Sequence, residues 1–176
     1  GDGKLPLEKI FGEEFKQLKS NNTNAIEISR LVIANEYRNE KEVLQLMINY
    51  LMIYAYHVKN YSALVIQVNP RHKLYYKTLL GFEEIGSEKK CPSVQNAPAV
   101  LLHLPLKHYQ SNVQRIANSP EPIKKERSLY PYFLKPEQEK LVAHYLKPQF
   151  KPMTAEELLY FGFSESGKNT AVCISK

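Results

Sequence analysis

The sequence predicts an α/β (α+β) fold in which a mixed sheet is built around a βαβ unit. Residues 63–68 form an apolar run rich in β-branched side chains, which is typical of a buried strand. Residues 41–59 carry apolar side chains at helical spacing over most of their surface, which indicates a helix lying against a sheet. Residues 25–34 predict a strand before that helix. The order strand, helix, strand predicts two parallel strands joined by a right-handed crossover.

The N-terminal region contains a second, shorter amphipathic segment. Residues 4–19 predict a turn and a short helix. Its apolar side consists of Ile10, Phe11, Phe15 and Leu18. The strand predicted over residues 25–34 carries Glu27 and Arg30 among apolar residues. Since charges inside an apolar strand are costly unless they are paired, hydrated or functional, these two residues mark a candidate site.

The buried strand over residues 63–68 is followed by a sharp change of direction. Asn69 and Pro70 end the strand, because proline has no amide donor and forces the preceding residue out of helical geometry. Residues 71–80 predict a short helix, and Gly81 predicts its left-handed cap. The packing side of this helix is predicted to consist of Leu74, Tyr75, Thr78 and Leu79.

The next segments complete the predicted sheet. Residues 82–85 predict a strand, residues 86–97 a loop, and residues 98–106 a final strand. In the final strand one face holds Val100, Leu102 and Leu104, and the other holds Leu101 and His103. We therefore place a first domain over residues 1–108 and a C-terminal extension over residues 109–176.

The C-terminal extension differs in character from the sheet domain. Residues 109–136 lose apolar periodicity and gain prolines and lysines, which predicts a linker or an arm packed on the domain. Two short helices are predicted over residues 136–146 and 154–161. Thr154 and Glu157 have the spacing of a capping box, in which the hydroxyl and the carboxylate satisfy exposed amides reciprocally.

The net charge of +6 is concentrated in one part of the chain. Residues 1–60 hold eight basic and eight acidic residues, whereas residues 61–176 hold sixteen basic and ten acidic residues. A basic region indicates either an acidic partner or an ordinary solvated face. No helix-turn-helix, zinc-finger or aromatic RNA-binding pattern is present, so we expect no nucleic acid to bind.

The sequence also bears on the compartment. No apolar run reaches the ~18 residues of a membrane span, and no secretory signal is present. Two cysteines, Cys91 and Cys173, fit a reducing environment, so we expect a cytoplasmic protein. Five histidines, at positions 57, 72, 103, 108 and 144, lack metal-ligand spacing, so we expect no metal. Gly1 stands where a methionine would begin a chain, which predicts a processed product or a fragment.

Two motifs in this order resemble one family. The first is the stretch Glu27-Ile28-Ser29-Arg30-Leu31, and the second is Asn69-Pro70 with Tyr76, Gly81 and Phe82. Together they resemble the N-acyl amino acid synthases, relatives of the acyl-homoserine-lactone synthases with the GNAT acyltransferase fold. Tyr76 lies five residues before the glycine, one more than in most acetyltransferases of this fold.

The resemblance covers residues 4–106 and implies a GNAT-like mixed sheet followed by a helical C-terminal extension. The family's first strands have no counterpart before residue 4, so the resemblance begins near the family's mid-point. We therefore expect a fragment of an enzyme, a fold completed by another chain, or a reduced fold that binds a protein partner without catalysis, through basic residues 107–151.

The resemblance also implies a reaction and its residues. Acylation of an amine requires removal of a proton, attack on a thioester carbonyl and stabilisation of an oxyanion. Glu27 is the implied general base, unless it only pairs with Arg30. Tyr76 is the implied proton donor to the departing thiolate, unless it is a core tyrosine. Ser29, Arg30 and Asn69 are expected to orient the substrates or the oxyanion.

The acyl donor is inferred from the segment after the first motif. Acetyl-CoA enzymes of this fold carry a glycine-rich loop there, whose amides cradle a pyrophosphate. Residues 34–43, ANEYRNEKEV, contain no glycine. We therefore expect an acyl-phosphopantetheine thioester on an acidic acyl carrier protein as co-substrate, with a long-chain acyl group and a small amine such as an amino acid. The alternative is a CoA-dependent N-acetyltransferase.

Overall fold

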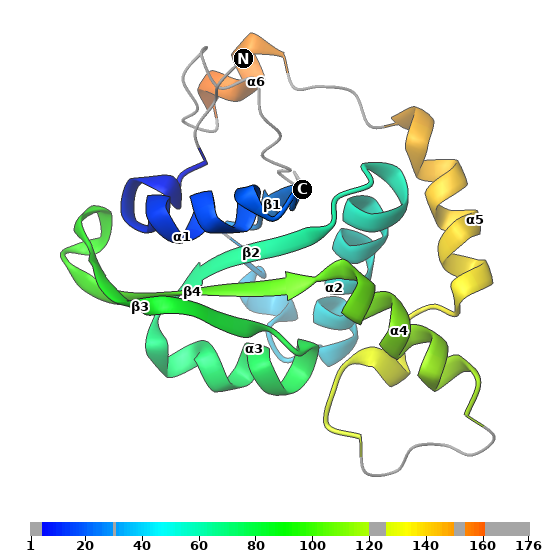
Figure 1. Ribbon diagram of the computed structural model, residues 1–176. Helices are drawn as coiled ribbons and strands as arrows, with labels where there is room; N and C mark the ends of the chain where they lie inside the picture. Colours follow the sequence, from blue (N-terminus) through cyan, green and yellow to red (C-terminus); the bar gives the residue numbers. More distant parts are fainter. Residues whose placement is uncertain (1–4, 30, 120–125, 150–153, 161–176) are drawn as a thin grey trace.

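The computed structural model describes residues 5–29, 31–119, 126–149 and 154–160. Within these ranges the chain forms a four-stranded mixed sheet with strand order β1-β2-β4-β3 (Figure 1). The strands are β1 (Ala25–Glu27), β2 (Ala63–Val68), β3 (Glu83–Cys91) and β4 (Ala97–Pro105). β1 and β2 are parallel, and β4 runs antiparallel to both β2 and β3. The predicted mixed sheet and its βαβ unit are confirmed.

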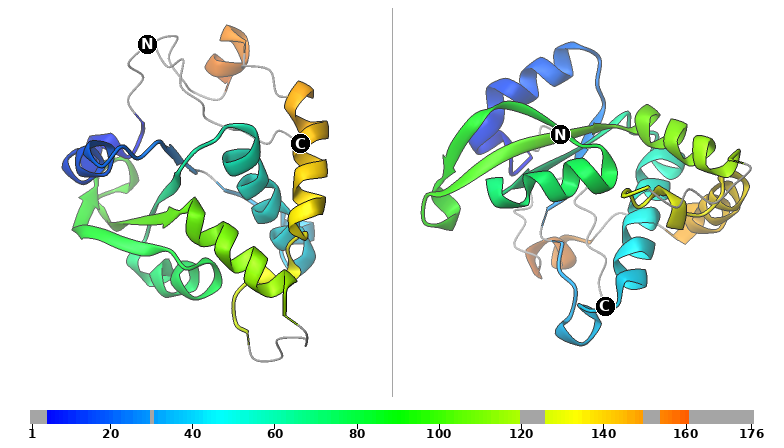
Figure 2. Two further views of the ribbon diagram at one scale, coloured as in Figure 1. Left: turned by 45° about the vertical axis from the view of Figure 1, so that its right-hand side comes forward. Right: turned by 90° about the horizontal axis from the view of Figure 1, so that it is seen from below.

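The helices cover both faces of this sheet. They are α1 (Glu8–Ser20), α2 (Lys41–Ile53), α3 (Lys73–Leu80), α4 (Leu106–Ala117), α5 (Pro136–Leu146) and α6 (Ala155–Tyr160). Helix α1 lies on one face, and α2, α3 and α4 lie on the other (Figure 1). A π-helical turn, Tyr54–Val58, extends α2, and α5 lies alongside it (Figure 2).

Strand alternation divides the buried side chains into two cores. The smaller core packs α1 against the sheet and consists of Leu7, Phe11, Phe15, Val65, Cys91, Ala99 and Leu101. The larger core lies on the other face, where it receives Val100, Leu102 and Leu104 of β4. Because successive residues of a strand point to opposite faces, β4 supplies both cores. The predicted alternation of residues 98–106 is confirmed for its leucines and valine.

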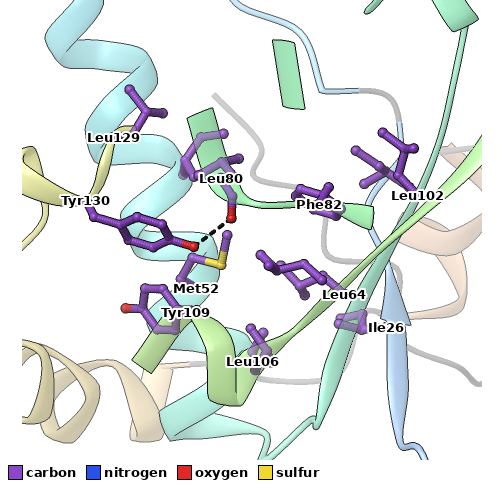
Figure 3. Close-up of a cluster of buried hydrophobic side chains, with 14 of the residues drawn as sticks. Ile26, Met52, Leu64, Leu80, Phe82, Leu102, Leu106, Tyr109, Leu129 and Tyr130 are labelled. Carbon is purple, nitrogen blue, oxygen red and sulfur yellow. Dashed lines mark hydrogen bonds between the residues drawn. The ribbon is translucent and has the colours of Figure 1, made fainter. Parts of the chain in front are cut away.

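The larger core joins the sheet to the C-terminal extension. Figure 3 shows Tyr109 and Tyr130 packed beside Leu80 and Met52. The Tyr130 hydroxyl donates a hydrogen bond of 2.6 Å to the carbonyl of Leu80. The prediction of an arm packed on the domain is therefore confirmed for this tyrosine-rich segment.

Several local predictions are also confirmed. Strand β2 and helix α5 have the predicted bounds. Gly81 caps α3 with φ of 77°. Glu157 accepts the Thr154 amide at 2.7 Å, and the Thr154 hydroxyl accepts the Glu157 amide at 3.2 Å, which is the predicted capping box.

Two predicted loops were wrong. Strand β3 continues through residues 86–91 as an edge strand, where most side chains are exposed and polar, so the sequence lacks the expected apolar alternation. Residues 109–117 belong to α4, which buries Tyr109 and Val113. Their i, i+4 spacing indicates a helix, but only two buried positions lie among otherwise polar or half-exposed residues.

Two further predictions need correction. The strand predicted over residues 25–34 ends at Glu27. The predicted packing side of α3 is wrong for Leu74, Tyr75 and Thr78, which are exposed, with Leu74 at 73%. The protein-facing side holds Leu79, as predicted, together with Tyr76 and Leu80. Tyr76, Leu79 and Leu80 are spaced i, i+3 and i+4, so they share one helix face next to the predicted one.

A buried carboxylate ties α5 to the domain. Glu139 is 3% exposed and accepts hydrogen bonds from Asn49 Nδ2, at 3.0 Å, and from the Tyr109 hydroxyl. His57 Nε2 lies 3.4 Å from the same carboxylate. Asn49 in turn accepts the amide of Leu134 at 2.9 Å. Because each buried polar group has a partner, this network fixes α2, α4 and α5 relative to one another.

Replacing this carboxylate should destabilise the fold. Glu139→Ala leaves the Asn49 and Tyr109 donors buried without an acceptor, so the free energy of unfolding should fall by about 3 kcal/mol. Urea unfolding measures it. Glu137→Ala, at an exposed position of the same helix, is the control and should change stability little. Equal effects of the two changes would contradict a role for the network.

Candidate active site

The site begins where β1 parts from β2. The two strands pair from Ala25 with Ala63 to Glu27 with Val65. One further bond extends this pairing, from the Ile28 amide to the Val65 carbonyl at 3.0 Å. Since residues two apart in a strand point the same way, the backbone amide of Gln67 also points toward the side from which β1 has departed.

A cavity of about 620 Å³ lies at this parting. Its polar lining comes mainly from Lys9, Glu27, Ser29, Gln67 and Tyr76. Its apolar lining includes Ile48, Leu51, Met52, Leu64, Ile66, Leu80 and Phe82. The cavity has the size of a small-molecule site, with an apolar body and a few convergent polar groups.

Glu27, a site residue expected from the sequence, lines this cavity. Its carboxylate accepts the Leu7 amide, just before α1, at 3.1 Å. Burial raises the pKa of the Glu27 carboxyl, the Leu7 amide lowers it less, and the nearby charge of Glu8 raises it further. A carboxylate with a raised pKa is a better proton acceptor than an exposed one. Arg30 lies outside the described residues, so its pairing with Glu27 stays a prediction.

Tyr76 lines the same cavity from α3. Its ring packs edge-on against Phe82, with 6.0 Å between centroids, and against Tyr75, with 5.4 Å. Burial, and secondarily Tyr75, raises the pKa of the Tyr76 hydroxyl, so this hydroxyl keeps its proton at neutral pH. The fold therefore brings a proton acceptor and a proton donor to one cavity, although the catalytic roles stay predictions.

The other predicted residues divide between the cavity and its surroundings. Ser29 lines the cavity. Asn69 is not among the lining residues, and its side-chain oxygen accepts the Arg71 amide at 3.2 Å. That bond caps the turn before α3, which gives Asn69 a structural use. Its predicted part in substrate orientation stays a prediction.

Sequence analysis missed Gln67, Cys91 and Lys9. Gln67 Nε2 donates to Cys91 Sγ at 3.2 Å, and both residues line the cavity. A glutamine inside the otherwise apolar run of β2 was the available signal. Cys91 fell in a predicted loop, and Lys9 gave no signal because a lysine on a short surface helix is ordinary.

Among the described residues, no group of three or more His, Cys, Asp and Glu side chains is arranged to hold a metal ion. Within those residues, no helix combines the length and the apolar character needed to cross a membrane.

A mixed sheet whose parallel strands part over such a cavity defines a GNAT-like fold. Residues 1–105 match the family described as N-acyl amino acid synthase FeeM, and the chain belongs to that family. The solved structure of FeeM, an N-acyl amino acid synthase from uncultured soil microbes, matches with a TM-score of 0.54 and 25% identity. The match covers 63% of this chain and 59% of that chain, so this chain spans about three fifths of its relative. A search of curated proteins gave no match.

The raised pKa of Glu27 predicts a pH dependence of stability. Because the folded carboxyl ionises at higher pH than the unfolded one, its contribution to the free energy of unfolding falls as pH rises between the two pKa values. Glu27→Gln removes this loss and keeps an acceptor for the Leu7 amide. Urea unfolding should show the variant gaining on the wild type as pH rises above about 4, the ordinary pKa of a glutamate.

The control is Glu13→Gln, an exposed carboxyl on α1. A stability difference between Glu27→Gln and the wild type that is constant with pH, or that shrinks toward neutral pH, would contradict the described environment of Glu27.

Proposed function

We propose that this chain is an N-acyltransferase that moves a long-chain fatty acyl group from an acyl carrier protein thioester to the amine of an amino acid or a similar small amine. The observation that carries the proposal is the meeting of a buried carboxylate, Glu27, and a protonated tyrosine, Tyr76, at one largely apolar cavity. Membership of the N-acyl amino acid synthase family supports it.

The proposed reaction uses these two groups in sequence. The Glu27 carboxylate takes a proton from the substrate ammonium, directly or through water, and the free amine attacks the thioester carbonyl carbon. The oxyanion that forms is stabilised by a backbone amide such as that of Gln67. When the carbon–sulfur bond breaks, the Tyr76 hydroxyl gives its proton to the departing thiolate. The nitrogen loses its second proton, which returns to the Tyr76 phenolate directly or through water, and an amide remains on the acceptor.

The cavity's two sides suit two substrates. Side chains from α2, β2 and α3 make the apolar side, which suits a fatty acyl chain. Lys9 of α1 stands at the polar side with Glu27 and Gln67. Its ammonium group suits the carboxylate of an amino acid, and Glu27 suits the amine.

The choice of donor rests on charge. Glu40 and Glu42 stand at the N-terminus of α2, where negative side chains oppose the binding of a pyrophosphate. Arg71, in the turn before α3, and Lys77 of α3 are exposed. A groove of about 400 Å³, lined in part by Arg38 and Tyr75, shares Tyr76 with the cavity and suits a pantetheine arm. Basic surface beside such a groove suits an acidic carrier protein.

The test is a transfer assay. The protein is incubated with a long-chain acyl carrier protein thioester and mixed amino acids, and in parallel with acetyl-CoA. Free thiol and an N-acyl amino acid, detected by mass spectrometry, should appear with the carrier protein. Glu27→Gln should lower turnover by about 10²–10⁴-fold, and this loss should ease as pH rises and the amine loses its proton unaided.

Other results would overturn the proposal. Transfer from acetyl-CoA and none from the carrier protein would favour the N-acetyltransferase. No transfer from either donor would favour a protein-binding module. A large loss of melting temperature in Glu27→Gln that Arg30→Met restores would make Glu27 the partner of a buried charge instead of the base. Glu13→Gln serves as the control with unchanged turnover.

A further inference from the structure

Gln67 is the one polar side chain of strand β2. The strand reads ALVIQV, so every other residue in it is apolar. Gln67 is half-buried and lines the cavity of the candidate site. An amide side chain carries two N–H donors and an acceptor oxygen, and burying these groups costs free energy unless they find partners. The partners of this amide therefore indicate what the cavity binds.

The nitrogen of the amide is paired within the protein. Gln67 Nε2 donates a hydrogen bond to Cys91 Sγ at 3.2 Å. Cys91 ends strand β3 and is 2% exposed, so it holds the amide from a fixed position. Within the described part of the chain, the Gln67 side chain makes no other hydrogen bond. With Nε2 turned toward Cys91, Oε1 is the atom that can accept a hydrogen bond from a ligand in the cavity.

The Gln67 and Glu27 side chains leave the same face of the sheet. Glu27 is paired in register with Val65, and Gln67 lies two residues after Val65. Residues two apart on a strand share a face, and on this face Val65 packs in the smaller core beneath α1. A rise of ~3.3 Å per residue and a strand spacing of ~4.8 Å place the Cα atoms of Glu27 and Gln67 roughly 8 Å apart. Two side chains of this length can hold one ammonium group between them.

The backbone of Gln67 serves the other reactant. Its amide points in the plane of the sheet, toward the side from which β1 has departed. Leu64 and Ile66, which also line the cavity, point to the opposite face, where the larger core lies. An acyl group on that apolar face and an amine on the α1 face therefore meet at residue 67.

We propose that Gln67 Oε1 accepts a hydrogen bond from the substrate amine and, together with Glu27, holds this amine for attack on the thioester carbonyl. The inference rests on the proposed function and adds a residue that binds the acceptor substrate. The ammonium group donates one N–H to Glu27 and another to Oε1. The bond to Oε1 persists after Glu27 has taken its proton, so the neutral amine stays beside the carbonyl carbon held at the Gln67 backbone amide.

The experiment compares Gln67→Met, Gln67→Glu and Cys91→Ala with the wild type. KM and kcat are measured separately for the amino acid that the transfer assay identifies and for the acyl carrier protein thioester. Methionine has a similar length and no acceptor oxygen, so KM of Gln67→Met for the amino acid should rise by about tenfold to a hundredfold, the value of a hydrogen bond to a charged donor. KM for the thioester should change little, because the backbone amide remains.

Gln67→Glu tests the acceptor oxygen directly. This variant keeps an acceptor and loses the donor to Cys91, so its KM for the amino acid should lie much closer to the wild type than that of Gln67→Met. A second carboxylate near Glu27 raises the pKa of that group, so the acidic limb of the pH–rate profile should move to higher pH. Cys91→Ala removes the partner of Nε2 and leaves Oε1, so its effect on KM should be smaller than that of Gln67→Met.

The matched control is Gln114→Met, at an exposed position of α4, which should change neither KM. An effect of Cys91→Ala as large as that of Gln67→Met would make the amide a structural group and overturn the assignment. Equal rises in both KM values in Gln67→Met, or no rise in KM for the amino acid, would overturn it as well.

A binding assay separates this inference from the proposed function. NMR titration measures the affinity of each protein for leucine and for N,N-dimethylleucine, which requires no catalysis. Leucine is the probe because Pro6, Ile10 and Val94 give the cavity apolar lining next to Lys9. The dimethyl derivative keeps a single N–H, which suffices for Glu27 alone. The wild type should therefore prefer leucine, and Gln67→Met should lose most of that preference.

The two failures are distinguishable. If the wild type transfers no acyl group, the proposed function fails, and a preference for leucine that depends on the residue at position 67 still supports the binding role of Gln67. A preference that Gln67→Met leaves unchanged, or the absence of leucine binding to the wild type, would contradict that role.

Discussion

The early end of the pairing between β1 and β2 is the constraint on which the rest of this structure depends. The strands are held together by three residue pairs in parallel register and by one further hydrogen bond, from the Ile28 amide to the Val65 carbonyl. Beyond them, the edge of β2 faces a cavity instead of a neighbouring strand. Backbone groups in such a place need hydrogen-bond partners, which water or a substrate can provide. The parting thus creates both the space for a ligand and donors aimed into it.

Packing on the two faces of the sheet keeps this opening in shape. Helix α1 and the smaller core support the polar side of the cavity, where the Glu27 carboxylate accepts a hydrogen bond from the Leu7 amide. The larger core holds α2 and α3 on the apolar side. Glu139 of α5 accepts hydrogen bonds from Asn49 of α2 and from Tyr109 of α4. Helix α2, which lines the apolar side of the cavity, is therefore held in place from behind. Groups held in this way lose little freedom when a substrate binds, which favours catalysis by positioning.

The sequence predicted the parts of this fold whose patterns are strong and local. The apolar run of β2, the helical period of α2, Gly81 and the bounds of α5 all derive from the residues themselves. The full length of strand β3 was not predicted from its residues, because an edge strand stabilised by backbone pairing to β4 needs no apolar alternation. Periodicity did not show which side of α3 packs, because Leu74 and Tyr75 are as apolar as the residues that face the protein.

The candidate site shows the same division. Glu27, Ser29 and Tyr76 were found through motifs, and the structure brings all three to one cavity. Gln67 and Lys9 are recognised as site residues only in the folded structure, where β1 parts from β2 and α1 lies beside the opening. Their residue types are too common on strands and helices to be a signal in the sequence. Asn69 was given a substrate role by its motif, whereas the geometry shows a capping bond to Arg71.

The most direct test of this account is a crystal structure of the protein with an unreactive analogue, a fatty acyl pantetheine whose thioester is replaced by an amide. The account predicts that the carbonyl lies beside the Gln67 amide and that the atom replacing the sulfur lies within hydrogen-bond distance of the Tyr76 hydroxyl. It also predicts that the acyl chain contacts the apolar side chains of α2, β2 and α3 that line the cavity. An analogue bound anywhere other than between β1 and β2, or absent at saturating concentration, would contradict it.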